Sequence, residues 1–164
     1  MTRYDTIIAA LKKHASDYDK FERRGKSAVV HVINLFAEYL EVPNGCLKVA
    51  APGSGFNTQN AAPLEYLVKR TDDGYFGAVV IVRDRNPLGV MLRTTVLVQV
   101  LEDSFVLKRE DEDQEFRVNE ITSVSCERFF EHIVANALEY LSTSPERLSS
   151  GQKRPIGFVW NSQK

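Results

Sequence analysis

The stretch best suited to binding a ligand is a glycine-containing segment that follows a β-rich run, Ala51-Pro52-Gly53-Ser54-Gly55-Phe56-Asn57-Thr58-Gln59-Asn60. About a dozen residues separate the strand-like segments on either side, and connections of that length inside a compact domain are often functional. Glycine permits close backbone approach, polar side chains offer neutral hydrogen bonds, and a phenyl ring offers an apolar anchor. The candidate ligand-binding residues are therefore Gly53, Ser54, Gly55, Phe56 and Asn57, with an ordinary mobile connection as the alternative.

Five carboxylates lie close together between Glu110 and Glu115, which raises the question of a cation site. Asp111, Asp113 and Glu115 alternate as the first ligands of a calcium loop do. The glycine and the distant glutamate that complete such a loop are absent from the sequence. We expect a solvated hairpin tip that resists edge pairing, with contact to a basic partner as an alternative.

None of the three histidines belongs to a motif typical of a metal or catalytic centre. His132 and Asn136 lie one turn apart on a predicted helix, where such residues commonly face solvent. No serine lies in a Gly-x-Ser-x-Gly motif, and neither Cys46 nor Cys126 has an activating base nearby in the sequence. We therefore predict no catalytic residue, no metal ligand and no cofactor, and keep an enzyme with a site invisible from the sequence as an alternative.

The segment Arg23-Arg24-Gly25-Lys26-Ser27 ends like a phosphate-binding loop. Such a loop needs a preceding strand and another glycine at the position that Lys20 occupies in this chain. We interpret Gly25 as a break between two helices and Ser27 as the cap of the second one.

Apolar residues at helical spacing predict two helices before residue 43 and one helix near the C-terminus. Pro43, Asn44 and Gly45 provide a strong stop and turn signal after the second helix. The three apolar stripes consist of Ile7, Ile8, Leu11 and Ala15; of Val29, Val32, Ile33, Phe36, Ala37 and Leu40; and of Phe130, Ile133, Val134, Ala137, Leu138 and Leu141.

Between the helices, six short β-rich segments alternate with turn residues at 46–51, 64–70, 75–82, 90–101, 105–108 and 115–118. Short connections favour antiparallel pairing, because parallel strands need long crossovers. The predicted fold is α+β: an antiparallel β-meander of about six strands packed by two N-terminal helices and one C-terminal helix. We expect a single domain over residues 1–143, followed at 144–164 by a polar linker and an apolar C-terminal tail.

The tail contains the candidate partner-binding residues Ile156, Phe158 and Trp160. Covering such large apolar side chains is worth about 1.5–3 kcal/mol each, so they should not stay in water. Three placements are open: a further strand on the chain's own sheet, addition to the sheet or groove of another subunit, or docking on a different protein as an extended peptide.

The bulk composition excludes several classes of protein. With 21 Lys and Arg against 22 Asp and Glu, the formal net charge is -1, so no overall field attracts nucleic acid and none is expected as a partner. No apolar run approaches the roughly 18 residues that suggest a bilayer span, and the N-terminus does not read as a signal peptide. We expect a cytoplasmic protein without a membrane partner, whose two cysteines stay reduced.

The leading functional hypothesis is a non-catalytic interaction module, such as a chaperone-like, adaptor or inhibitor protein, that binds a protein partner or self-associates through its tail. The alternative is a small-molecule-binding protein. Its apolar pocket would lie between the sheet and the C-terminal helix, lined by Phe130, Val134 and facing strand residues, with the segment around Phe56 as a lid.

Overall fold

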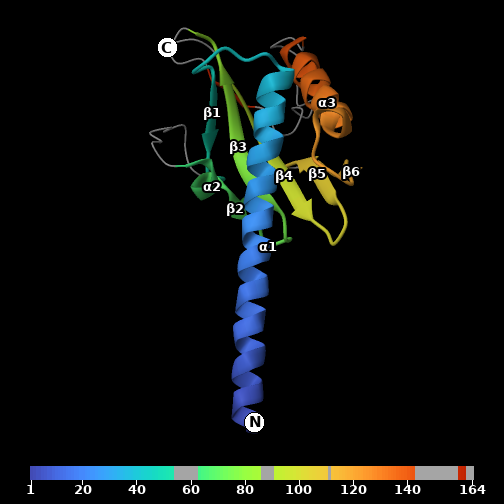
Figure 1. Ribbon diagram of the computed structural model, residues 1–164. Helices are drawn as coiled ribbons and strands as arrows, with labels where there is room; N and C mark the ends of the chain where they lie inside the picture. Colours follow the sequence, from blue (N-terminus) through green and yellow to red (C-terminus); the bar gives the residue numbers. More distant parts are fainter. Residues whose placement is uncertain (54–62, 86–90, 111, 143–158, 162–164) are drawn as a thin grey trace.

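The computed structural model describes residues 1–53, 63–85, 91–110, 112–142 and 159–161, and Figure 1 shows a long helix, a sheet and a second long helix. The helices are α1 (Arg3–Tyr39), the single turn α2 (Leu64–Leu67) and α3 (Ser123–Ser142). The strands are β1 (Leu47–Ala50), β2 (Lys69–Arg70), β3 (Phe76–Arg83), β4 (Met91–Val100), β5 (Phe105–Arg109), β6 (Phe116–Val118) and β7 (Val159–Asn161).

All seven strands belong to one antiparallel sheet with the order β1-β3-β4-β5-β6. β2 pairs with the beginning of β3 along the edge that β1 occupies further on, and β7 pairs with the beginning of β4. The sheet and the three helices confirm the α+β class and the antiparallel meander that the sequence predicts.

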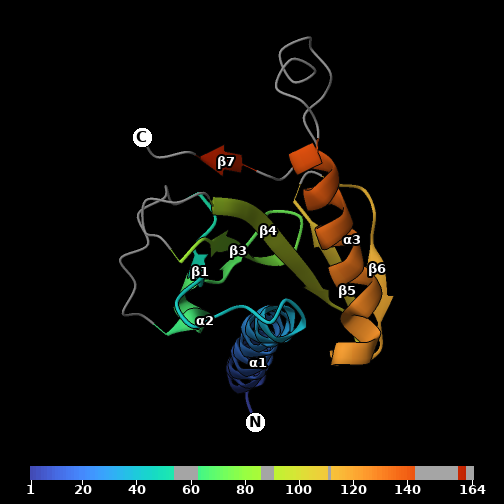
Figure 2. The same cartoon turned by 90° about the horizontal axis from the view of Figure 1, so that it is seen from above.

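The main core lies on one face of the sheet, where both long helices pack. Alternation along β3 points Phe76, Ala78 and Val80 toward this core, while Val79 and Ile81 point to the other face and form a small cluster with Ala50. Figure 2 looks along α1 and shows that helix against the sheet, with α3 beside β5 and β6. The two long helices bury the following residues in the main core: Ala28, Val29, Val32, Ile33 and Phe36 of α1, and Cys126, Phe129, Phe130, Ile133, Ala137 and Tyr140 of α3.

The two helical segments expected before residue 43 form one uninterrupted helix of 37 residues, so the break expected at Gly25 is wrong. Gly25 is buried, and a Cβ atom at this position would overlap the ring of Phe76 on β3. The glycine therefore lets α1 approach the sheet closely. The N-terminal cap of α1 is Thr2. Its hydroxyl accepts a hydrogen bond from the amide of Asp5, and the Asp5 carboxylate accepts one from the amide of Thr2.

A second difference concerns residues 64–70, where a strand was expected. The chain forms a helical turn after Pro63, with the amide of Tyr66 donating to the carbonyl of Pro63, and only Lys69–Arg70 pair with β3. Leu67 and Val68 are consecutive and both buried in the main core. A regular strand would send them to opposite faces, so the turn buries apolar surface that a strand would leave outside the core.

The Gly25 contact makes a stability prediction. Gly25→Ala should lower the free energy of unfolding by about 1–3 kcal/mol through overpacking against Phe76, although alanine is the better helix former. Urea unfolding followed by circular dichroism measures the loss. Ser16→Ala, in the exposed half of the same helix, is the control and should be neutral or slightly stabilising.

A double-mutant cycle with Phe76→Leu identifies the cause, because the smaller side chain should reduce the loss from Gly25→Ala. If Gly25→Ala is as harmless as Ser16→Ala, the close approach of α1 to β3 is wrong.

Candidate functional site

The glycine-containing segment falls mostly outside the described residues. Gly53 is described: it is exposed and adopts a left-handed conformation with φ of 78°, in the turn after β1. Ser54, Gly55, Phe56 and Asn57 lie outside the described part of the chain, so their predicted ligand-binding role stays a prediction.

The C-terminal tail is described only at β7. Its backbone pairs with the beginning of β4, with Trp160 in register with Leu92, which is the first of the three placements expected. Ile156 and Phe158 lie outside the described residues, as do the side chains of β7. The predicted partner-binding role of the tail therefore stays a prediction.

The structure contains an apolar pocket between the end of α1, the sheet and α3, with a volume of about 190 Å³. The surface of the pocket is apolar, and Thr94 is the one polar side chain among its described lining residues. Its lining comes from Phe36 and Leu40 of α1, Val82 of β3, Leu92 and Thr94 of β4, and Ile133, Val134, Ala137, Leu138 and Leu141 of α3.

This position matches the pocket that the sequence suggests between the sheet and the C-terminal helix, with two differences. Val134 lines the pocket as expected, whereas Phe130 is not among the lining residues. The ring of Phe130 is instead packed against Phe36 and Tyr39 of α1, at centroid distances of 5.3 and 5.5 Å, and is almost fully buried. The end of α1 supplies the remaining wall of the pocket. The sequence interpretation did not include this wall, because it placed the pocket between the sheet and the C-terminal helix only.

Two leucines of α3 that line the pocket are also exposed. Leu138 is 61% exposed and Leu141 is 46% exposed, although both also line the pocket. Ala137, which directly precedes Leu138, is buried and is the smallest residue of the α3 wall, so it leaves the hollow unfilled. Since no lining residue is titratable, the site can hold an apolar group but offers no acid, base or charged ligand.

A separate polar cluster joins β5 to α3. The side chain of Arg109 is fully buried, and its Nη1 lies 3.0 Å from Oε1 of Glu112. Oε2 of Glu112 lies 2.9 Å from Nε2 of His132, and Nδ2 of Asn136 donates to Oε1 at 3.1 Å. Glu112 therefore connects a buried guanidinium with two side chains on the polar side of α3.

The electrostatics of this cluster indicate a structural role, and we call Arg109, Glu112, His132 and Asn136 the clamp. Burial lowers the pKa of Arg109, while the nearby Glu112 carboxylate raises it. A buried charge of this kind needs its counterion, because an uncompensated charge in the interior is strongly destabilising. The sequence shows His132 and Asn136 one turn apart but not their partner, since the contact joins residues twenty or more positions away.

Most described carboxylates of the acidic segment are exposed, as expected: Glu110, Asp113 and Glu115 face solvent, whereas Glu112 is half-buried beside Arg109. Glu115 also accepts a hydrogen bond of 2.7 Å from the hydroxyl of Tyr75. Burial and then this hydrogen bond raise the pKa of Tyr75 to about 12. Within the described residues, no group of three or more histidine, cysteine or acidic side chains is arranged to hold a metal ion.

Both cysteines are buried and unpaired with each other. Burial raises the pKa of the Cys126 thiol, an effect that hydrogen bonds from Ser125 and the backbone oppose only in part. A thiol in such surroundings is a poor nucleophile, since the thiolate is the reactive form.

Comparison with known proteins gives no relative from which a function could be inferred. No protein-family model matches the chain, and neither a curated protein nor a solved structure shows significant similarity to it. In the part of the chain that the structure describes, none of the helices combines the length and apolar character needed to cross a membrane.

The clamp makes a prediction for Glu112→Gln. This change keeps the size of the side chain but removes the Glu112 charge that lies 3.0 Å from the buried Arg109 guanidinium, so the free energy of unfolding should fall by about 2–3 kcal/mol. Asp113→Asn is the matched control, because it removes an exposed carboxylate from the same segment. Urea unfolding of both variants checks the result, and equal stabilities would show that Glu112 does not hold the buried arginine.

Proposed function

We propose that this chain is a non-catalytic interaction module that holds an apolar side chain of a partner protein in the pocket between α1, the sheet and α3. The observation that supports this most is the apolar surface of that pocket, whose lining includes two exposed leucines on α3. An apolar hollow of this kind gains free energy when a matching apolar group displaces water from it.

The size of the pocket favours one side chain over a whole small molecule. Pockets that enclose complete small ligands usually measure about 300–1,000 Å³. Here the volume is about 190 Å³, closer to the roughly 150 Å³ of an apolar cavity that takes up benzene. A leucine, methionine or phenylalanine side chain is of suitable size and chemistry.

The rim supports the same occupant. Leu138 and Leu141 stand partly in water beside the opening, where a partner backbone carrying the inserted side chain would cover them. Covering a large apolar side chain is worth about 1.5–3 kcal/mol, so these residues would extend the interface beyond the pocket itself. Interfaces commonly concentrate most of their binding energy in a few well-packed side chains.

A small-molecule-binding protein is the second candidate, because an apolar pocket would equally accept a compact hydrocarbon group. The two candidates differ in what remains outside: a peptide continues across Leu138 and Leu141, whereas a small ligand ends within the pocket. Native mass spectrometry of the purified chain separates them, since a small ligand adds its own mass to the protein.

Ala137→Phe tests the proposed function by filling the pocket from α3. The full chain is screened against a displayed library of random peptides, and the affinities of selected peptides are measured by fluorescence polarisation. Selected peptides should share one large apolar residue, and Ala137→Phe should weaken their binding by about 10- to 100-fold, which corresponds to the lost burial of that residue.

Ala135→Phe is the matched control, because it introduces the same ring at an exposed position of α3 that does not line the pocket. Its peptide affinities should equal those of the unmodified chain, and thermal unfolding should show both variants folded. Peptides that bind Ala137→Phe as tightly as Ala135→Phe would contradict a binding role for the pocket.

A further inference from the structure

One buried polar side chain lies in the wall of the apolar pocket. Thr94 of β4 is only 3% exposed, and among the described residues its hydroxyl oxygen Oγ1 has no hydrogen-bond partner. Buried hydroxyls are normally hydrogen-bonded, because taking one out of water without a partner costs free energy. An unpartnered hydroxyl in the wall of a hollow therefore indicates that the group entering the hollow supplies the missing bond.

The position of Thr94 in the sheet explains why it lacks a partner. Alternation along β4 turns Leu92, Thr94 and Val96 to the face that the helices cover, and the cross-strand neighbour of Thr94 on β3 is Val80. On the other side of β4, β5 pairs from Val96 onward and β7 pairs as far as Arg93, so Thr94 lies at the junction of these two strands. Leu92, Val96 and Val80 have no polar side-chain atom that could satisfy the hydroxyl.

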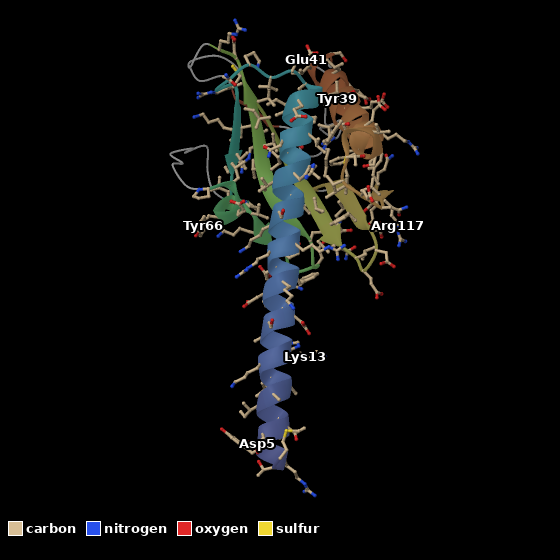
Figure 3. The ribbon with its side chains drawn as sticks, in the orientation of Figure 1. Asp5, Lys13, Tyr39, Glu41, Tyr66 and Arg117 are labelled. Carbon is tan, nitrogen blue, oxygen red and sulfur yellow. The ribbon has the colours of Figure 1, made fainter. Side chains whose placement is uncertain are left out.

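The walls of the pocket opposite the sheet are apolar as well. α3 contributes only hydrocarbon side chains, and α1 contributes Phe36 and Leu40. Figure 3 shows this end of α1, marked by Tyr39, beside α3. Every described lining side chain except Thr94 is therefore a hydrocarbon, and a polar partner for Thr94 has to come from the occupant.

The Thr94 hydroxyl can turn toward the hollow without losing a bond. The pocket surface is apolar although Thr94 lines it, so carbon atoms of Thr94 face the hollow in this structure. The β-carbon of threonine carries a methyl and a hydroxyl group, and rotation about the Cα–Cβ bond between staggered conformations changes which of them faces the hollow. Since Oγ1 makes no hydrogen bond in its present position, this rotation breaks none.

These features define the chemistry of the occupant: an apolar body with one neutral polar group. A charged group is excluded, because the apolar walls offer it no counterion. Tyrosine and tryptophan both combine an apolar ring with one polar group. A tyrosine ring is benzene with one added oxygen, which suits a pocket of about 190 Å³, slightly larger than the roughly 150 Å³ cavity that takes up benzene. The double ring of tryptophan is larger.

We propose that the partner side chain held in the pocket is a tyrosine, whose ring fills the hollow and whose hydroxyl forms a hydrogen bond with Oγ1 of Thr94. This inference rests on the proposed function, because it specifies the occupant of the same pocket. A leucine or phenylalanine side chain matches the walls but leaves Thr94 unpartnered. A site that bonds to a hydroxyl discriminates against an analogue that lacks it.

Side-chain analogues test the hydrogen bond in the full chain. p-Cresol has the ring and hydroxyl of tyrosine, toluene lacks the hydroxyl, and NMR titration of the methyl signals measures both dissociation constants. Thr94→Val should weaken p-cresol binding by about 3- to 10-fold and leave toluene binding equal or tighter, because valine keeps the shape and removes the hydroxyl. Ala137→Phe should abolish binding of both compounds, since it fills the pocket.

Thr95→Val is the matched control. It makes the same change at the next residue of β4, which is buried, points to the opposite face of the sheet and does not line the pocket. Both dissociation constants should stay unchanged in Thr95→Val, and Thr94→Ser should keep p-cresol binding because it keeps the hydroxyl. Thr94→Val should fold at least as stably as the unmodified chain, because it removes a buried hydroxyl without a partner. Equal effects of Thr94→Val on p-cresol and toluene would overturn the proposal.

The peptide screen gives a second readout that separates this inference from the proposed function. The residue that selected peptides share should be tyrosine, and its replacement by phenylalanine should weaken binding to the unmodified chain more than to Thr94→Val. Selected peptides that share leucine or phenylalanine, and that Ala137→Phe no longer binds, would contradict the tyrosine while supporting the binding role of the pocket.

Discussion

Burial of the apolar stripe of α1 against one face of the sheet is the interaction on which the rest of the structure depends. Val29 and Val32 are completely buried between helix and strands, and Gly25 brings the helix close enough to lie against Phe76. Phe36 in turn packs against Phe130, so the position of α1 also sets the position of α3. A one-sided sheet needs such a cover, because its apolar face would otherwise remain in water.

The apolar pocket and the exposed half of α1 both arise where this burial ends. At the C-terminal end of α1 the helix stops at Tyr39, short of filling the space between the sheet and α3, and the apolar pocket remains. At the other end the sheet stops first, and the stripe continues into solvent past Tyr18. The Arg109–Glu112 clamp has a structural role. Glu112 contacts Arg109 of β5 on one side and His132 and Asn136 of α3 on the other, so these polar groups link α3 to the sheet.

Local patterns were sufficient to predict the α+β class, since the stripe around Val32 and the alternation along β3 follow from neighbouring residues. The role of Gly25 could not be predicted in this way. A glycine is expected both at a helix break and where a helix approaches a sheet closely, and only the position of Phe76 distinguishes the two. The pairing of Glu112 with His132 and the α1 wall of the pocket likewise depend on contacts between distant parts of the chain. Periodicity placed Phe130 and Val134 on one face of the C-terminal helix, but only Val134 lines the pocket. Phe130 is covered by α1, and periodicity alone does not show which residues a neighbouring helix covers.

Hydrogen exchange along α1 tests most directly whether the sheet covers one half of this helix and leaves the other half uncovered. The amides from Gly25 to Phe36 should be strongly protected, as expected for the packed half. Those from Thr6 to Asp17 should exchange much faster, because a helical segment without tertiary packing is only marginally stable in water. Equal protection of the two halves, or rapid exchange around Val32, would contradict this account.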